Sequence, residues 1–227
     1  MKAMLLAAGR GERLRPLTDR RPKPLVEAGG KALIAWHLGR LAAAGCREVV
    51  INVSHLADQI LDYVGDGARF GLHVAYSREP EPLETAGGIA QALPLLGHQP
   101  FLVVNADTYC EIGFGRLLAF DLRAMLAHLV LIPNPPHHPR GDFTLRAGLV
   151  GYEEAPRYTY AGIAVMSPEL VSSVKRGSKS PLLPHLCSAA DQRRLGGELF
   201  TGLWQDVGTA QRLAELEATL ASRNEPR

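Results

Sequence analysis

A cluster of cations on a flexible turn is the first feature of the chain that could do chemistry. The apolar run Ala3–Ala8 is followed by GRGERLR, which carries two glycines and three arginines. A glycine-rich turn after a buried strand presents backbone N–H groups at the carboxyl edge of a parallel sheet, where they can bind an anion. Gly9 and Gly11 permit close approach and positive φ. Arg13 and Lys23 can supply charge to phosphate oxygens, so these residues predict a phosphate site. A solvated basic loop is the alternative on charge pattern alone.

Two aspartates could hold a metal ion beside those phosphates. Asp107 follows the apolar segment FLVVN, and Asp206 lies in LWQDVGT. A carboxylate at the carboxyl end of a strand suits a Mg²⁺ that also binds phosphates. The structural alternatives are an Asx turn for Asp107 and a helix N-terminal charge for Asp206.

The spacing of the glycines and cysteines excludes several other sites. The first loop is neither GxGxxG nor a P-loop, which argues against a dinucleotide-dependent oxidoreductase. Cys46, Cys110 and Cys187 are far apart and lack CxxC spacing, so no zinc site or disulfide framework is indicated. Buried thiols in a reducing compartment are expected instead.

Alternating apolar and helical patterns must position the candidate residues. This order predicts an α/β fold, with one Rossmann-like domain and a mixed, mostly parallel central sheet flanked by helices. In the first half, strands are expected at 3–8, 48–53, 72–76 and 101–105, and helices at 33–44, 56–64 and 85–93, the last one closed by Pro94. In the second half, strands are expected at 127–132 and 160–166, a turn or hairpin at 149–157 and an amphipathic helix at 209–222. The proline-rich segment PNPPHHPRGDF is predicted to be a loop.

The amino-acid composition limits the classes of partner that the chain could bind. It has 227 residues, 25 basic and 23 acidic, which gives a net charge of +2 with the histidines neutral. This balance argues against nucleic acid or a membrane surface as a partner. No apolar run is long enough to span a membrane, and the first one is not a signal peptide. We therefore expect one domain over 1–227 in the cytoplasm.

The segment MKAMLLAAGRGERLRPLTDRRPKPLVEAGGKALI resembles the signature of the sugar 1-phosphate nucleotidyltransferases, LAAGxGxRLxPLTxxxPKPLxxxxGKPLI. The segments LETAGGI, VVNADTY, YAGIAVMSPEL and WQDVGT are similar to later landmarks of that family and occur in the same order. The resemblance implies a Rossmann-like nucleotidyltransferase fold and attack of a sugar 1-phosphate on the α-phosphate of an NTP. Pyrophosphate leaves and an NDP-sugar forms. No protein nucleophile is required.

The resemblance also implies roles for residues at matching positions. Arg13 and Lys23 would be catalytic, with Arg13 at the leaving pyrophosphate and Lys23 on phosphate oxygens. Asp107 and Asp206 would hold Mg²⁺, as one or as two ions. The nucleotide would bind in the half up to about residue 108 and the sugar in the half from 109 to 227. The nucleotide-binding residues implied are Leu6, Ala7, Ala8, Gly9, Gly11, Glu12, Arg13, Lys23, Ala86, Gly87 and Gly88.

The chain departs from the family pattern in a few places. It has Asn105-Ala106-Asp107 where NGD is common, and GKALI where GKPLI is common. No charged group is lost. The hexapeptide repeat of a left-handed β-helix is missing, which argues against the members fused to an acetyltransferase.

The loop NPPHHPRGDFTL bears on the choice of sugar. With PLETAGGI and GDGARFG, it most resembles the branch of the family that transfers uridylyl groups to N-acetylmuramate 1-phosphate in peptidoglycan recycling. UTP would then be the nucleotide. Asn105, Asp142 and Glu154 are the candidate sugar contacts, and Arg140 a candidate partner for a lactyl carboxylate. Asp142 could instead shape a turn, and Glu154 could be a solvated charge. The adjacent His137 and His138 favour a loop surface over a metal site.

Other specificities and one other class of protein stay open. Glucose 1-phosphate thymidylyltransferase, mannose 1-phosphate guanylyltransferase and phosphocholine cytidylyltransferase share the catalytic residues named above. A catalytically inert nucleotide-sugar sensor is the alternative outside enzymes, and the presence of both cations and both acids disfavours it. A monomer and a homodimer are both compatible with the sequence.

Overall fold

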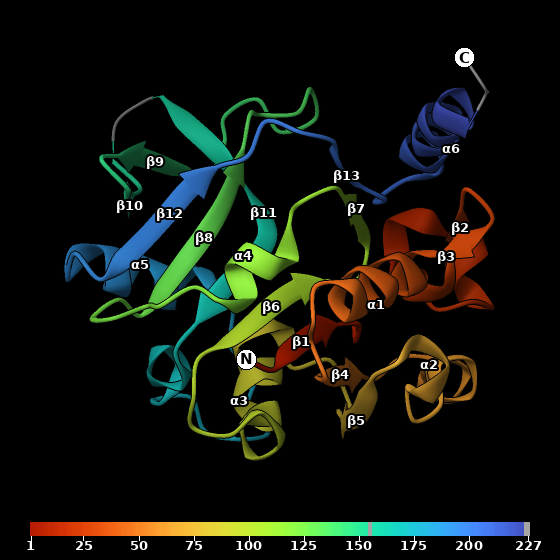
Figure 1. Ribbon diagram of the computed structural model, residues 1–227, viewed down its shortest axis with the longest axis horizontal. Coiled ribbons are helices and arrows are strands. Elements are labelled where there is room, and N and C mark those ends of the chain that lie inside the picture. Colours follow the sequence, from red (N-terminus) through yellow and green to blue (C-terminus); the bar gives the residue numbers. More distant parts are fainter. Residues whose placement is uncertain (154–155, 225–227) are drawn as a thin grey trace.

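Four parallel strands form the first half of the sheet in the computed structural model, which describes residues 1–153 and 156–224. β1 (Ala3–Leu6) lies between β4 (Glu48–Val53) and β6 (Phe101–Asn105), and β5 (His73–Arg78) pairs with β4 at the edge. β1, β4 and β6 are nearly continuous apolar runs, as burial on both faces requires, whereas the edge strand β5 is more polar. Figure 1 shows β1 in red within this part of the sheet.

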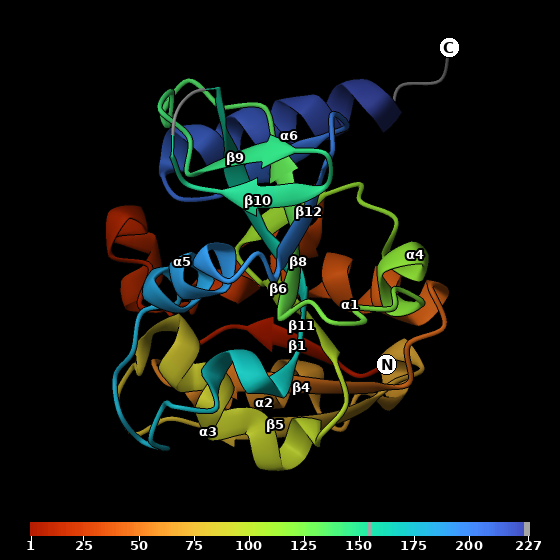
Figure 2. The same cartoon turned by 90° about the vertical axis from the view of Figure 1, so that its left-hand side faces the viewer.

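The second half adds strands of mixed direction. β11 (Arg157–Met166) runs antiparallel to β6 and to β8 (Ala127–Ile132), and β12 (Leu195–Leu199) runs parallel to β8. β10 (Leu149–Gly151) and β9 (Phe143–Arg146) complete the sheet in the order β5-β4-β1-β6-β11-β8-β12-β10-β9. Figure 2 shows the β9–β10 hairpin at the end of the molecule away from β5. The sheet is mixed, as predicted, but parallel pairing is concentrated in the first half.

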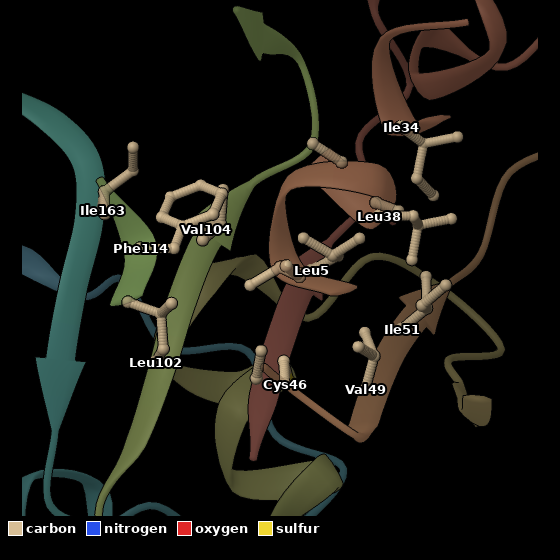
Figure 3. Packing of buried hydrophobic residues seen from close by; sticks show 14 of the residues in the cluster. Leu5, Ile34, Leu38, Cys46, Val49, Ile51, Leu102, Val104, Phe114 and Ile163 are labelled. Carbon is tan, nitrogen blue, oxygen red and sulfur yellow. The ribbon is translucent and has the colours of Figure 1, made fainter. Parts of the chain in front are cut away.

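Helices cover both faces of the sheet and enclose separate layers of core. One layer joins α1 (Leu33–Ala43), α2 (Ala57–Val64) and α4 (Phe114–Leu118) to the sheet through residues such as Leu5, Leu38 and Ile51 (Figure 3). The other layer packs α3 (Glu84–Leu96) and α5 (Leu183–Asp191) against the sheet, where Ile89 of α3 and Leu186 of α5 are buried with Met4 of β1. Leu5 and Met4 are neighbours that point to opposite faces, as the period of two in a strand dictates.

Two small sheets and the last helix extend the carboxyl edge. β7 (Thr108–Cys110) pairs with β13 (Trp204–Asp206), and β2 (Glu27–Ala28) pairs with β3 (Lys31–Ala32). α6 (Ala210–Asn224) packs beside β2, where Leu216 and Leu220 are buried with Leu14 and Val26 (Figure 1). Thr209 Oγ1 accepts a hydrogen bond from the Arg212 N–H at 3.3 Å, which confirms the expected start of this helix.

One helix end differs from the prediction, and several elements of the second half were not predicted. α3 continues through Pro94 to Leu96, because the Gly97 N–H still bonds to Leu93 O at 2.8 Å and the proline removes only one donor. Part of the expected turn or hairpin at 149–157 is the strand β10, which pairs with β9. α5, β7 and β12 were not identified, since short or glycine-containing segments carry little periodicity.

Candidate active site

The loops after β1 and β6 meet at one edge of the sheet. Leu6, the last residue of β1, is in register with Asn52 on one side and Asn105 on the other. Because β4 and β6 flank β1, the order of the strands reverses there, and a crevice opens beyond their carboxyl ends. The glycine-rich loop and Asp107 therefore border the same crevice.

A first cavity lies directly beyond β1. The predicted residues Leu6, Ala7, Ala8 and Gly9 line it, together with Lys23, Pro24, Asn52, Glu79, Pro82, Glu84, Thr85, Asn105 and Asp107. Its walls combine apolar residues such as Leu6 and Ala8 with polar groups such as Asn52 and Thr85. Such a mixture suits a base with its ribose.

A buried polar network forms one wall of this first cavity. Asn52 Oδ1 accepts the Ala7 N–H at 2.8 Å, and Asn52 Nδ2 donates to Glu79 Oε1 at 2.7 Å. Glu79 Oε2 accepts the Leu83 N–H at 2.9 Å. Burial raises the pKa of Glu79, although both hydrogen bonds oppose that shift. The network ties the start of the glycine-rich loop to the entrance of α3.

A second cavity lies between the glycine-rich loop and the segment that leads to α3. Gly9, Arg10, Gly11, Glu12, Arg13 and Lys23 line one side, and Glu81, Pro82, Asp107, Lys179 and Gly208 line the rest. Gly11 has a φ of +65°, the left-handed conformation expected for it. The concentration of cations along this cavity suits a polyphosphate.

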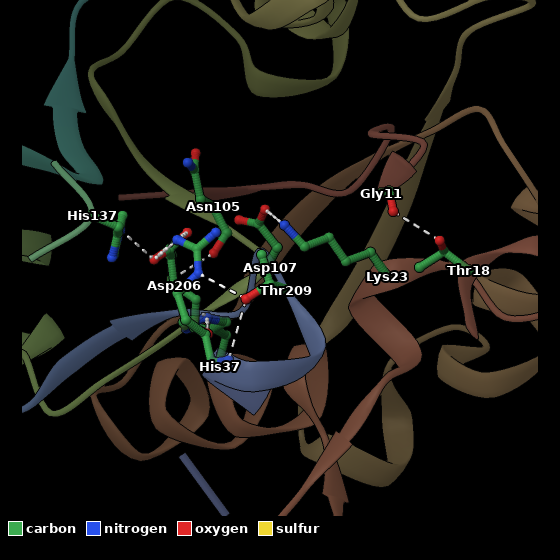
Figure 4. Close-up of polar contacts among 11 residues, drawn as sticks. Gly11, Thr18, Lys23, His37, Asn105, Asp107, His137, Asp206 and Thr209 are labelled. Atoms are coloured by element: carbon green, nitrogen blue, oxygen red, sulfur yellow. Dashed lines mark hydrogen bonds and ion pairs between the residues drawn. The ribbon is translucent and has the colours of Figure 1, made fainter. Parts of the chain in front are cut away.

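An ion pair between Lys23 and Asp107 connects the two sides of the crevice. The ammonium of Lys23 donates to Asp107 Oδ2 (Figure 4). The Lys23 side chain is only 9% exposed, whereas 35% of the Asp107 side chain is exposed. The lysine is therefore held in place by packing, and the carboxylate keeps one side open to the crevice.

Asp206 lies next to Asp107 across the β7–β13 pair. The Val207 N–H donates to Asp107 O at 3.0 Å, and Asp206 is in register with Thr108. Arg212 Nη1 contacts both oxygens of Asp206, at 2.6 and 2.5 Å, and His137 Nε2 lies 3.0 Å from Oδ1 (Figure 4). The predicted second metal acid is thus held by two side chains that the sequence analysis did not connect with it.

The two carboxylates match the ligand preference of Mg²⁺. Residues 1–153 and 156–224 contain no group of three or more His, Cys, Asp or Glu side chains arranged to hold a metal. Mg²⁺ commonly binds through one or two carboxylates, with water and substrate phosphates as the other ligands. Asp107 borders the second cavity and Asp206 lies beside it across the β7–β13 pair, so the two carboxylates fit that pattern.

A third cavity lies on the side of the second half of the chain. Its lining includes Asn105, which also lines the first cavity, and the two histidines of the proline-rich loop. The full set is Arg13, Asn105, Asp107, Thr108, His137, His138, Thr159, Tyr160, Ala161, Gly162, Trp204, Asp206 and Arg212.

Two other residues of the proline-rich loop that were predicted near the sugar lie outside this lining. Among the described residues, Asp142 and Arg140 are not part of the lining of the third cavity. Asp142 Oδ2 accepts the Tyr160 N–H at 2.8 Å and Oδ1 lies 2.9 Å from His138 Nε2, so this carboxylate fastens the loop to β11. Arg140 is exposed. Glu154 lies outside the described residues.

The small residues of α3 lie behind the wall of the first cavity. Ala86, Gly87 and Gly88 are buried, and in the described part of the chain they do not line the cavities named above. Glu84 and Thr85, which directly precede them, line the first cavity instead. The absence of side chains at 87 and 88 allows close packing. A Cβ on Gly88 would lie 2.7 Å from Glu79 Oε1.

Several residues of the site were missed by sequence reasoning. Asn52 and Glu79 stand at or just after the carboxyl ends of β4 and β5, which is the same signal that identified Asp107. Arg212 and Lys179 carried no such signal. Arg212 lies on a helix and Lys179 on a loop, and the sequence does not show that either segment packs against the crevice.

Comparison with known proteins identifies the family of this chain. Residues 2–143 match the family model described as nucleotidyl transferase. The chain therefore belongs to the nucleotidyltransferase family, whose members carry out the class of reaction that the crevice suits.

Among similar proteins, the N-acetylmuramate alpha-1-phosphate uridylyltransferase of Neisseria meningitidis is 51% identical over 96% of this chain and 97% of its own. The enzyme of the same name from Caulobacter vibrioides is 38% identical over 96% of each chain. A solved structure from Bacillus anthracis, named as a glucose-1-phosphate thymidylyltransferase, shares the fold with a TM-score of 0.87 at 18% identity, over 100% of this chain and 98% of its own. None of the helices described is long and apolar enough to cross a membrane.

Proposed function

We propose that this chain transfers a uridylyl group from UTP to N-acetylmuramate α-1-phosphate, forming the UDP-sugar and pyrophosphate. The main structural support for this proposal is that Asp107 lines all three cavities. A base with ribose, a polyphosphate and a sugar phosphate would therefore meet at one point. The identity and coverage of the two uridylyltransferase relatives support the choice of base and sugar.

In this proposal, the parts of the substrates occupy the cavities in order. The base and ribose bind in the first cavity, beside the Asn52–Glu79 network. The β- and γ-phosphates bind in the second cavity, and the sugar 1-phosphate enters the third. Most of the nucleotide contacts then come from residues 1–108, with Lys179 and Gly208 as contributions from the second half.

The reaction needs charge neutralisation and alignment more than a protein nucleophile. A phosphate oxygen of the sugar 1-phosphate attacks the α-phosphorus while the bond to the β-phosphate breaks. Lys23 lies where the first and second cavities meet and offsets charge on the reacting phosphates, and Arg13 borders both the second and the third cavity. Mg²⁺ held by Asp107 and Asp206 would supply further positive charge and orient phosphate oxygens. We also propose that the reaction takes place in the cytoplasm and serves peptidoglycan recycling.

The test is a screen for pyrophosphate release with Mg²⁺. UTP, ATP, GTP, CTP and dTTP are each paired with N-acetylmuramate, N-acetylglucosamine, glucose and mannose 1-phosphates, and with phosphocholine. We expect the highest kcat/KM for UTP with N-acetylmuramate 1-phosphate. A preference for dTTP with glucose 1-phosphate would overturn the choice of base and sugar. No release with any pair, from a protein that still binds nucleotide, would favour the inert sensor.

A further inference from the structure

We propose that Lys179 is a further phosphate-binding residue, which contacts the β- and γ-phosphates of the nucleotide from the wall opposite Arg13. This inference deepens the proposed function and rests on it for the identity of the ligand. Lys179 lines the second cavity although it lies on the loop between β11 and α5, remote in sequence from the glycine-rich loop.

The backbone on both sides of Lys179 is fixed against α3. Ser180 O accepts the N–H groups of Ala86 and Gly87 at 3.0 and 3.1 Å, and the Ser180 N–H donates to Leu83 O at 3.0 Å. On the other side, Ser178 O passes so close to α3 that a Cβ on Gly87 would lie 2.4 Å from it. We call residues 178–180 the strap. Its position is set by backbone contacts, so the place of Lys179 at the cavity does not depend on its own side chain.

The side chain of Lys179 is paired with a group that a polyphosphate can replace. Its Nζ lies 2.8 Å from Glu81 Oε2, with 55% of the lysine side chain and 64% of the glutamate side chain exposed. The hydrogen bond and charge of Lys179 lower the pKa of Glu81, and Arg10 across the cavity adds to that shift. An exposed pair of this kind is weak in water. A triphosphate carries several negative charges, so it competes effectively with one carboxylate for the same ammonium.

Glu81 then has a defined part in the empty protein. It neutralises Lys179 when no nucleotide is bound, and it places a negative charge in a cavity that must accept anions. Removing the carboxylate frees the ammonium and lowers the repulsion, so Glu81→Gln should tighten polyphosphate binding while Lys179→Ala weakens it. If Lys179 had no role in phosphate binding, neither variant should change the affinity for polyphosphate.

The experiment measures binding of inorganic tripolyphosphate and of UMP by calorimetry, in low salt because exposed charges are screened by ions. The variants are Lys179→Ala, Lys179→Arg and Glu81→Gln. Lys175→Ala is the matched control, an exposed lysine on the same loop that does not line the described cavities. We expect Lys179→Ala to weaken tripolyphosphate binding about tenfold, Lys179→Arg to restore most of it, and Glu81→Gln to strengthen it several-fold. UMP affinity should stay constant in all of them.

Kinetics separate this inference from the proposed function. In Lys179→Ala, the KM for UTP should rise about tenfold and the KM for the sugar 1-phosphate should not change. Tripolyphosphate binding that is equal in Lys179→Ala, Lys175→Ala and the unaltered protein would overturn the role of Lys179. If UTP is not turned over with any sugar, the proposed function fails, yet a selective loss of tripolyphosphate binding in Lys179→Ala would still support the phosphate contact.

Discussion

Asp107 is the residue on which the three cavities converge, and its carboxylate also pairs with the buried Lys23. Asp107→Asn removes the charge but keeps an oxygen that can accept from Lys23. We expect kcat to fall by about three orders of magnitude or more, because the metal and the reacting phosphates lose a charged partner. Steady-state kinetics and circular dichroism together test this.

The matched control is Asp58→Asn, which alters an exposed ion pair with Arg78 at 2.9 Å. That variant should keep normal activity. Near-normal turnover in folded Asp107→Asn would contradict the metal role of this aspartate.

Glu84 is held in a conformation that its side chain disfavours. Its φ is +61°, at the first residue of α3 and in the wall of the first cavity. The left-handed conformation costs a residue other than glycine roughly 1–2 kcal/mol. Glycine avoids this cost, but it also gains more conformational freedom in the unfolded chain, which offsets part of the benefit. Glu84→Gly should therefore raise the free energy of unfolding by about 0.5–1 kcal/mol in urea titrations.

Glu84→Ala is the control, because alanine removes the carboxylate and keeps the strain. If Glu84→Gly is no more stable than Glu84→Ala, the backbone at this position is not strained. Strained residues are often found at functional sites. Both variants lack the carboxylate, so a raised KM for UTP in both would show that this group takes part in nucleotide binding.

At the scale of elements, the contact between α3 and the strap depends on the missing side chain at Gly87. Gly87→Ala would push a Cβ into Ser178 O, a backbone atom that cannot turn aside. We expect a loss of about 1–3 kcal/mol in the free energy of unfolding, as overpacking commonly causes, and weaker tripolyphosphate binding because the strap carries Lys179.

Gly39→Ala provides the matched comparison within a helix. Gly39 lies in α1, and a Cβ there meets nothing within 4 Å. The substitution should stabilise the protein by up to about 1 kcal/mol through helix propensity alone. Equal effects of the two substitutions, measured by chemical denaturation, would contradict the close approach of the strap.

At the scale of the whole molecule, His37 links stability to pH. It is fully buried in α1, and its Nε2 lies 2.7 Å from Thr108 O. Burial lowers the pKa of His37 from 6.5 to about 4, against the effect of that hydrogen bond. Between these values the unfolded chain binds a proton that the folded chain does not. The free energy of unfolding should therefore fall by about 3 kcal/mol as the pH drops from 6.5 to 4, and this term should be constant above 6.5.

Urea titrations at several pH values check this prediction. His37→Gln keeps an N–H donor for Thr108 O and removes the titration, so the slope in this pH window should become shallower. An unchanged slope would show that other groups cause it.

Local sequence patterns account for much of the first half of the molecule. Continuous apolar runs and helical spacing predict the βαβ order, so 48–53 and 101–105 are strands as predicted, and so is 127–132 in the second half. The carboxyl ends of parallel strands share one edge, and this rule already brought the glycine-rich loop and Asp107 together. These inferences succeed because they depend on local periodicity and on one general rule of topology.

The packing of segments that are far apart in the sequence determines which side chains complete the site. Arg212 and His137 hold Asp206, the strap brings Lys179 to the second cavity, and Asp142 fastens a loop to β11. Such contacts join segments that no local pattern connects. They depend on the packing of α3 and α6 and on the path of loops, and packing is decided by the shapes of all the buried side chains together.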